Sequence, residues 1–453
     1  MNKFSLPNDT ICAISSPPGI GGIAVIRTSG KDALLIVDSI FSKSLKKSKG
    51  YSVLYGTIFE GNKEIDHVIV TIFKNPHSFT GEDVVEISCH GSTFIQQKIL
   101  ELLCINGARI ANPGEFSKKA FLNGKFDLSQ TEAIADLINS RSNAAHEMAI
   151  KQMRGGFSNE LKNLRAKLID FASLIELELD FSEEDVEFAD RKKLYEFVDE
   201  LINHLNILKN SFKLGNAIKN GVSTVIAGRP NAGKSTLLNN LLNEDRSIIS
   251  SKAGTTRDTI EEILNINGID FRLVDTAGIR KSKDEIEQIG VKKTLEKISN
   301  SSIVIYIYDC SIISKKEVNE DLEKYLKKEI PCLVIANKID LLNNTKNIPN
   351  QHFKASLSLD VNMEGFKNKI YELFTNQNLD YQGVIISNLR HYEALENANK
   401  ELVKVKTGLD NNTSGDFLAM DIRQALQYIG TITGEISSDE LLGNIFANFC
   451  IGK

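Results

Sequence analysis

Three short motifs combine residue types and spacings suited to binding a nucleoside triphosphate. The first, GRPNAGKS at 228–235, has the pattern G-x-x-x-x-G-K-[ST], follows the apolar run STVIAG and precedes the helical pattern TLLNNLLN. In such a loop, backbone N–H groups and a helix N-terminus surround the phosphates, while the lysine reaches the β- and γ-phosphates. We therefore predict that Lys234 contacts phosphate and that the Ser235 hydroxyl binds Mg²⁺.

The second motif, NKID at 337–340, indicates which base the site accepts. The carboxylate of Asp340 can accept hydrogen bonds from the N1–H and the exocyclic amine of guanine, with Asn337 and Lys338 packed around the base. Adenine lacks this pair of donors, so a site built in this way rejects ATP strongly. The motif therefore predicts GTP.

The third motif, DTAG at 275–278, is typical of the segment that senses the γ-phosphate. Asp275 is expected to hold Mg²⁺ through water, and the N–H of Gly278 to meet the γ-phosphate. AGTTRD at 253–258 lies where a first switch loop belongs, with Thr256 as the second Mg²⁺ ligand. The loop behind the base is expected near 354–359, although Ser356-Leu357 replaces the usual Ser-Ala.

The residues after DTAG raise a question about hydrolysis. Ras-like GTPases have a Gln shortly after this motif that orients the attacking water. Here Ile279 and Arg280 follow, and Ile cannot hydrogen-bond a water molecule. Either the protein does not hydrolyse GTP, or another group positions the water.

The arrangement of elements predicts a multidomain α/β protein. Residues 220–378 alternate β-rich runs with helical patterns, as in a mostly parallel, doubly wound sheet. Residues 1–124 are predicted to be mixed α and β, whereas 125–219 and 379–453 are helical. The simplest architecture inserts the α/β domain into a helical domain built from both flanks.

The composition is that of a soluble globular chain. The 453 residues are 42% hydrophobic and 25% charged, and the net charge of −5 requires a local basic patch for any nucleic-acid contact. We expect no signal peptide and no membrane span. The six scattered cysteines, without a CxxC pair, favour the reducing cytoplasm.

Three stretches outside the nucleotide motifs resemble the MnmE (TrmE) family of tRNA modification GTPases. They are PPGIGGIAVIRTSG (17–30), RIANPGEFSKKAFLNGKFDLSQTEAIADLI (109–138) and DELLGNIFANFCIGK (439–453). The resemblance covers essentially the whole chain. It implies an N-terminal α+β domain (1–124) that dimerises and binds folate, a split helical bundle (125–219 and 379–453) and an inserted Ras-like GTPase domain (220–378).

The resemblance also implies an activity and partners. Family members act as homodimers with the FAD-dependent protein MnmG (GidA), in a heterotetramer, to add an aminomethyl-type or carboxymethylaminomethyl group at C5 of the wobble uridine of certain tRNAs. The one-carbon unit is attributed to 5-formyl-tetrahydrofolate or methylene-tetrahydrofolate. GTP hydrolysis, stimulated by K⁺ and by pairing of the GTPase domains, drives a conformational cycle, and tRNA is expected to bind through the complex.

Matched positions imply roles for residues of the nucleotide site. Asn231 would hold K⁺, with oxygen atoms of Ser250, Lys252 and Thr255 completing the shell, and Glu287 would replace the missing Gln. Without the resemblance, Glu287 would be interpreted as a solvated helix residue. The predicted GTP-binding residues are Asn231, Ala232, Gly233, Lys234, Ser235, Thr236, Ser250, Ser251, Lys252, Ala253, Gly254, Thr255, Thr256, Asp275, Thr276, Ala277, Gly278, Asn337, Lys338, Ile339 and Asp340.

A folate site is implied by four further residues, Arg27, Glu86, Lys125 and Lys453. A carboxylate can pair with the amide and amino groups of a pterin, and cationic side chains suit its glutamate tail. Cys450, in the C-terminal FCIGK, is a candidate for assisting the chemistry, and an inert thiol is the alternative. Each of these residues by itself would be an ordinary charge or thiol.

Two other functions fit the GTPase motifs by themselves. The chain could be a GTPase switch of the ribosome-assembly or signalling type, or a helical scaffold with an inactive phosphate loop. The intact Lys234, Ser235, Asp275 and Asp340 disfavour the scaffold. The flanking stretches favour a tRNA-modification enzyme over a switch.

Overall fold

The computed structural model describes residues 9–180, 191–245, 261–275, 297–299, 301–325, 330–342, 348–359, 363–375, 383–411, 413–447 and 449–452. Several predicted site residues lie outside this set: Ser250, Ser251, Lys252, Ala253, Gly254, Thr255, Thr256, Thr276, Ala277, Gly278, Glu287 and Lys453. The chain forms two compact units, described separately here. The first comprises 1–138, 152–189 and 413–453, and the second comprises 139–151 and 190–412.

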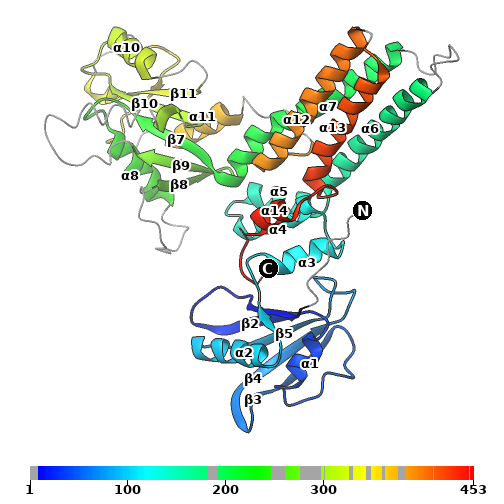
Figure 1. The fold of residues 1–453 in the computed structure, drawn as a ribbon. Helices are drawn as coiled ribbons and strands as arrows, with labels where there is room; N and C mark the ends of the chain where they lie inside the picture. Colours follow the sequence, from blue (N-terminus) through cyan, green and yellow to red (C-terminus); the bar gives the residue numbers. More distant parts are fainter. Residues whose placement is uncertain are drawn as a thin grey trace. The chain divides into compact units, whose positions relative to one another are not determined.

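A six-stranded sheet organises the first unit (Figure 1). Its order is β3-β4-β5-β2-β1-β6, formed by β1 Ile11–Ile14, β2 Gly21–Ser29, β3 Ser52–Glu60, β4 Lys63–Phe73, β5 Val84–Gly91 and β6 Arg109–Ile110. Pairing is antiparallel except between β1 and β6. Alternate residues of β4 and β5 are buried, as expected for a sheet with one face on the core.

Two helices contribute to the core of this sheet. They are α1 Ala33–Asp38 and α2 Thr93–Ile105, and α2 buries Gln96, Ile99, Leu102 and Leu103, a spacing that places them on one helical face. The three apolar side chains of this set pack with Ile26, Val70 and Ile87 of the strands. The remaining helices of this unit are α3 Glu115–Leu122, α4 Leu128–Asn139, α6 Gly156–Asp180, α13 Gly415–Thr433 and α14 Asp439–Phe446, and α13 packs along α6.

A second six-stranded sheet forms the centre of the second unit. Its order is β12-β11-β10-β7-β9-β8, from β7 Val222–Ala227, β8 Glu261–Ile266, β9 Ile269–Asp275, β10 Ile303–Asp309, β11 Cys332–Asn337 and β12 Phe353–Lys354. All pairs are parallel except β8 with β9. Every residue of β10 is buried, which explains why its sequence is aliphatic or aromatic as far as the final Asp309.

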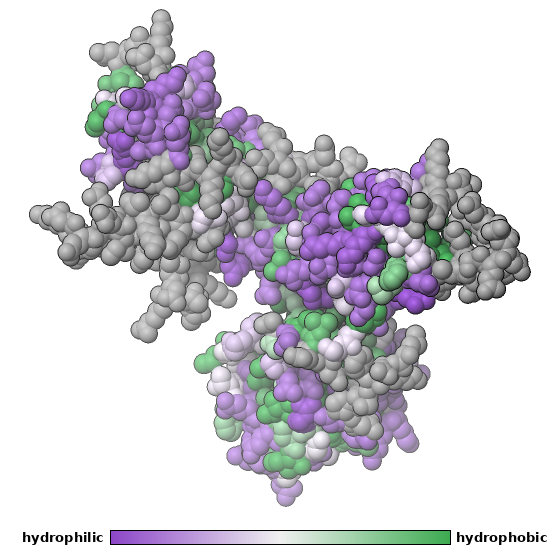
Figure 2. Space-filling view, turned by 45° about the horizontal axis from the view of Figure 1, so that its top comes forward, coloured by the Kyte–Doolittle hydropathy of each residue, from purple (hydrophilic) through white to green (hydrophobic). Residues whose placement is uncertain are grey.

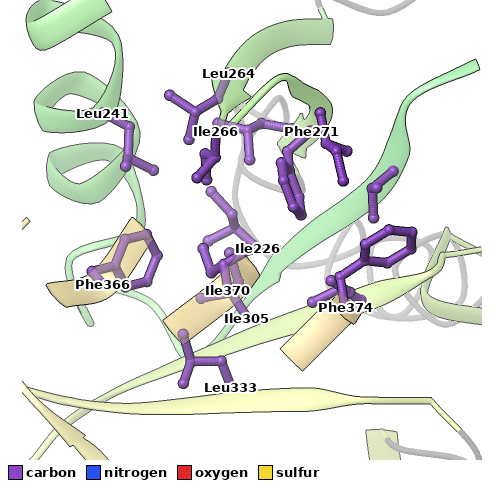
Figure 3. Packing of buried hydrophobic residues seen from close by; sticks show 14 of the residues in the cluster. Ile226, Leu241, Leu264, Ile266, Phe271, Ile305, Leu333, Phe366, Ile370 and Phe374 are labelled. Atoms are coloured by element: carbon purple, nitrogen blue, oxygen red, sulfur yellow. The ribbon is translucent and has the colours of Figure 1, made fainter. Parts of the chain in front are cut away.

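Helices pack against both faces of this sheet. Figure 3 shows Leu241 of α8 (Lys234–Asp245) and Phe366 and Phe374 of α11 (Met363–Thr375) directed toward strand residues such as Ile305 and Phe271. On the other face, Val318 of α10 (Lys315–Tyr325) packs with Val225 and Tyr306. The unit also contains α7 Arg191–Asn220, which packs along α12 Leu389–Asp410, helix α5 Asn143–Met153, and the short helix η2 Ile339–Leu341.

The predicted fold class is confirmed. One mixed sheet lies near the N-terminus, helices come from both flanks, and a largely parallel sheet lies between them in sequence. Figure 2 shows one face of the molecule, where hydrophilic residues cover most of the described surface and hydrophobic residues form small groups. Within the described ranges, no helix has the length and apolar character needed to cross a membrane.

Candidate nucleotide and folate sites

The phosphate-loop motif connects β7 to α8, and its backbone requires glycine at two points. Gly228 has φ +148°, and a Cβ there would lie 2.1 Å from the carbonyl oxygen of Ile307. Gly233 has φ +108°, and a Cβ there would lie 2.2 Å from Nδ2 of Asn337. Asn231, the predicted K⁺ ligand, has φ +58°. The motif therefore adopts a tight loop that ends at the N-terminus of α8, as phosphate binding requires.

The side chain of Lys234 is bound by backbone carbonyl groups of the phosphate loop. Its ammonium Nζ donates to the carbonyl oxygens of Gly228, at 2.7 Å, and Arg229, at 2.9 Å. These contacts keep the cation at the entrance of the loop, where it can form charge-assisted hydrogen bonds to phosphate oxygens.

Arg229 ties the same loop to α10. Its Nε donates to Oδ2 of Asp321 at 2.7 Å, and its Nη1 donates to Oε1 of Glu317 at 3.1 Å. The buried Tyr306 also donates its hydroxyl to Asp321 at 2.6 Å. Hydrogen bonds from Ser314 and then Arg229 lower the pKa of Glu317 to about 2. Sequence reasoning did not identify this clamp, because Arg229 occupies a variable position of the motif.

Asn337, the first residue of NKID, contacts both the phosphate loop and the loop that contains Leu357. Its buried amide donates from Nδ2 to the carbonyl of Ala232 at 2.8 Å, and its Oδ1 accepts from the N–H of Leu357 at 3.1 Å. Asn337 thus links the phosphate loop to the loop that contains Leu357. Its expected packing around the base stays a prediction.

The next residue, Lys338, pairs with the strand beside it. Its Nζ lies 2.5 Å from Oδ2 of Asp309, the last residue of β10. Burial by itself raises the pKa of Asp309, but hydrogen bonds from Lys338 and Ser311 outweigh burial and hold that pKa below its ordinary value. The ion pair leaves the aliphatic part of Lys338 on the cavity wall.

Asp340 is held by the loop that follows β12. The hydroxyl of the buried Ser356 donates to Oδ1 of Asp340. The backbone of this loop is fixed by Asn240, whose Nδ2 donates to the Leu357 carbonyl at 2.7 Å. The loop expected near 354–359 therefore lies beside NKID, although it carries Leu357 where Ser-Ala sequences carry alanine.

These elements surround one cavity of about 620 Å³, a size suited to a nucleotide. It is lined by Pro230, Asn231, Gly233, Lys234, Ser235, Thr236, Asn337, Lys338, Asp340, Leu341, Leu357 and Ser358. Eight of the predicted GTP-binding residues are among them. The side chain of Ala232 is instead buried in the hydrophobic core of the unit, and Ile339 packs against a second hydrophobic cluster. The other four lining residues are Pro230, which lies within the phosphate-loop motif, Leu357 and Ser358, which lie within the loop expected behind the base, and Leu341, which no motif indicated.

The backbone also places Asp275 near the phosphate loop. Asp275 ends β9 and is the register partner of Ile226 in β7, two residues before Gly228. Parallel strands that end together present their following loops at one edge of the sheet.

A second cluster lies in the first unit around Arg27. Its Nε and Nη2 each lie 2.8 Å from Oε1 of Glu86, on the neighbouring strand. The guanidinium also lies over the rings of Phe79 and Phe116, at 5.6 and 5.7 Å from their centroids. The structure thus brings two of the four predicted folate residues together beside aromatic surface.

The C-terminal tail reaches the same cluster. The Gly452 carbonyl accepts from Nη1 of Arg27 at 3.2 Å and from the Ser15 hydroxyl at 3.1 Å. Cys450 is exposed, and its carbonyl accepts from the N–H of Gly114 at 3.3 Å. Lys125 donates to the Pro76 carbonyl at 3.0 Å, within the loop that contains Phe79. Nothing in the sequence indicated that Phe79 and Phe116 lie against Arg27, because their only signal was their aromatic character.

No group of three or more metal-ligating side chains occurs in the part of the chain that the structure describes.

Comparison with known proteins identifies the family. Sequence models described as the N-terminus of GTP-binding protein TrmE and the MnmE helical domain match residues 10–125 and 128–450. The tRNA modification GTPase MnmE of Cytophaga hutchinsonii is 51% identical over 98% of both chains. That of Flavobacterium johnsoniae is 50% identical over 98% of this chain and 99% of the other. Among solved structures, Era in complex with MgGDPNP and a segment of 16S ribosomal RNA is 26% identical, with 40% of this chain and 66% of that chain covered and a TM-score of 0.28. The chain belongs to the family of the tRNA modification GTPase MnmE.

Proposed function

We propose that the chain hydrolyses GTP as part of an enzyme that modifies the wobble uridine of tRNA at C5. The observation that carries this proposal is the cavity in which Lys234 and Asp340 face a common space of nucleotide size. The near-full-length similarity to tRNA modification GTPases supports the tRNA reaction.

The residues of the cavity have distinct roles in this proposal. The backbone N–H groups of the phosphate loop and Lys234 bind the phosphates, and Ser235 binds Mg²⁺ together with Thr256. Mg²⁺ supplies charge neutralisation at the phosphates. Asp340 accepts the guanine donors while Ser356 fixes its orientation.

We further propose that hydrolysis depends on K⁺ and on pairing of two GTPase domains. Asn231, Ser250, Lys252 and Thr255 would hold K⁺, a charge that replaces an arginine finger. Glu287 would position the water. Asn231 lines the cavity in a strained backbone conformation, which supports a functional constraint at that residue.

A folate site around Arg27, Glu86, Lys125 and Lys453 completes the proposal. Arg27 offers charge, and the partly exposed Phe79 offers apolar surface to a planar ring, while the fully buried Phe116 packs behind the guanidinium. The exposed Cys450 lies on the tail next to this cluster. We propose that a reduced folate binds here, that the chain acts as a homodimer with MnmG, and that the domains divide at 1–124, 125–219, 220–378 and 379–453.

One variant tests the hydrolytic part of the proposal. Glu287→Ala should retain GTP affinity and lose K⁺-stimulated phosphate release, with Glu320→Ala as a control on the exposed side of α10. Full K⁺-stimulated turnover in Glu287→Ala would remove this residue from the mechanism.

Mass spectrometry of wobble uridines tests the tRNA part. Cells that lack the protein should lose the C5 modification, and the wild-type gene should restore it. Purified protein that hydrolyses GTP but binds no 5-formyl-tetrahydrofolate would instead favour a GTPase switch.

A further inference from the structure

A loop in the first unit is positively charged, whereas the whole chain has a net negative charge. Four lysines occur within seven positions, Lys43, Lys46, Lys47 and Lys49, and no Asp or Glu occurs from 39 to 59. All four lysines are exposed. A local concentration of positive charge on an acidic protein is the electrostatic signature of a polyanion-binding surface.

The loop has a fixed backbone. Leu45 is fully buried, and its N–H donates to Oδ1 of Asp38 at 2.5 Å. Ser42 exchanges two hydrogen bonds with Thr57 of β3, both at 2.9 Å. The lysines therefore extend from an anchored backbone, which lowers the entropic cost of ordering them on a ligand.

A fifth lysine and an aromatic ring adjoin the loop. Cβ of Lys74 lies 3.6 Å from the position that a Cβ on Gly50 would take. Tyr51 has φ +58°, an unusual conformation for a tyrosine, and its side chain is 69% exposed with its ring edge-on to Phe73. This conformation leaves an aromatic face in solvent beside the cations.

The nearby carboxylates that the structure describes bind groups other than these lysines. Among the described residues, none of the five lysines forms an ion pair. The nearby Asp38 and Asp83 accept hydrogen bonds from the backbone N–H groups of Leu45 and Asn75. Glu82 is paired with Lys119.

We propose that Lys43, Lys46, Lys47, Lys49, Lys74 and Tyr51 form an RNA-binding surface, termed the lysine loop surface, which contacts the phosphate backbone of the tRNA substrate. This inference rests on the proposed function for the choice of RNA. Lysines bind phosphates without reading sequence, and an exposed aromatic ring stacks on unpaired bases.

Charge reversal tests the surface. The variant K46E/K47E/K49E is compared with K162E/K315E/K316E, which reverses three exposed lysines elsewhere. Fluorescence anisotropy measures binding of a labelled, transcribed tRNA whose anticodon begins with uridine, from about 50 to about 300 mM KCl. The loop variant should bind roughly 10-fold or more weakly, and the slope of log K against log salt should fall by about 2 to 3. The control should match wild type.

Tyr51 provides a second, milder variant. Tyr51→Ala should weaken binding a few-fold without changing the salt slope, and Tyr51→Phe should restore it, because stacking requires the ring and not the hydroxyl. Equal affinities and slopes for the loop variant and its control would overturn the proposal, as would absence of tRNA binding by wild type. The proposal would also be overturned if the loop variant lost binding to phosphatidylserine vesicles but kept wild-type affinity for tRNA, a result that would indicate a membrane-binding surface.

GTP turnover separates this proposal from the proposed function. The loop variant should hydrolyse GTP as wild type does, because its substitutions lie in the other unit from the nucleotide cavity. Wild-type protein without GTPase activity would contradict the proposed function, whereas active variants with undiminished tRNA binding would contradict only the lysine loop surface.

Discussion

The nucleotide cavity and the Arg27 cluster are built in different ways. The cavity is formed by loops at one edge of a parallel sheet, and backbone groups and short motifs supply most of its lining. The Arg27 cluster is assembled from neighbouring strands, an aromatic loop, a helix and the C-terminal tail. Residues that share one loop lie at fixed distances along the chain and therefore form a recognisable motif. Side chains brought together from separate elements form no such motif.

The comparison also concerns tolerance to substitution. Gly228 and Gly233 cannot carry a side chain without displacing their neighbours, so the geometry of the cavity is fixed by the backbone. Around Arg27 the geometry depends on an ion pair and two rings. We therefore expect larger effects from single substitutions in the cavity than in the cluster.

Lys234→Ala is expected to have the largest effect. Loss of charge-assisted hydrogen bonds to phosphate should cost about 3 kcal/mol, or roughly 100-fold in GTP affinity, measured by calorimetry. Lys316→Ala, on the exposed side of α10, is the control. A less than threefold loss in Lys234→Ala would show that the loop lysine is not a phosphate ligand.

Asp340→Asn should have the next largest effect. The amide keeps the size of the side chain but cannot accept both guanine donors, so GTP affinity should fall by roughly 30-fold. The affinity of Asp340→Asn for ATP should equal that of the wild-type chain. An equal fall in affinity for GTP and ATP would indicate collapse of the cavity. The control is Asp416→Asn, at an exposed residue of the first unit.

Arg27→Gln probes the dispersed site. Removal of one charged donor from a partly exposed cluster should weaken 5-formyl-tetrahydrofolate binding by roughly 10-fold and leave GTP binding unchanged. Arg109→Gln is a matched control because Arg109 is paired with Asp9 and Glu115 in the same unit. If both variants lost folate binding equally, the effect would be on folding and not on a ligand contact.

Arg229→Gln should have the smallest effect, because 38% of the Arg229 side chain is exposed and exposed ion pairs contribute little. We expect roughly threefold weaker GTP binding in Arg229→Gln and in Asp321→Asn. The double variant should be no weaker than Arg229→Gln, because that single variant already removes the contact between Arg229 and Asp321. Additive losses would show that the two side chains act independently.

Predictability from sequence differed between local motifs and tertiary contacts. The parallel sheet, the phosphate loop and NKID were predictable because their chemistry depends on local backbone geometry. Arg27 and Glu86 could be proposed only from family resemblance, since they are 59 positions apart and meet through strand pairing. The Arg229 clamp and the Asn337 bridge were not predictable, because each depends on a tertiary partner with no sequence pattern.

The central claim is that Asp340 makes the cavity specific for guanine. The direct measurement is calorimetric titration of the wild-type chain, with Mg²⁺ present, by non-hydrolysable analogues of GTP, ITP and ATP. Inosine keeps N1–H but lacks the exocyclic amine, so we predict ITP to bind roughly 10-fold more weakly than GTP, and ATP more than roughly 1,000-fold more weakly. ATP affinity within tenfold of GTP affinity would contradict the claim.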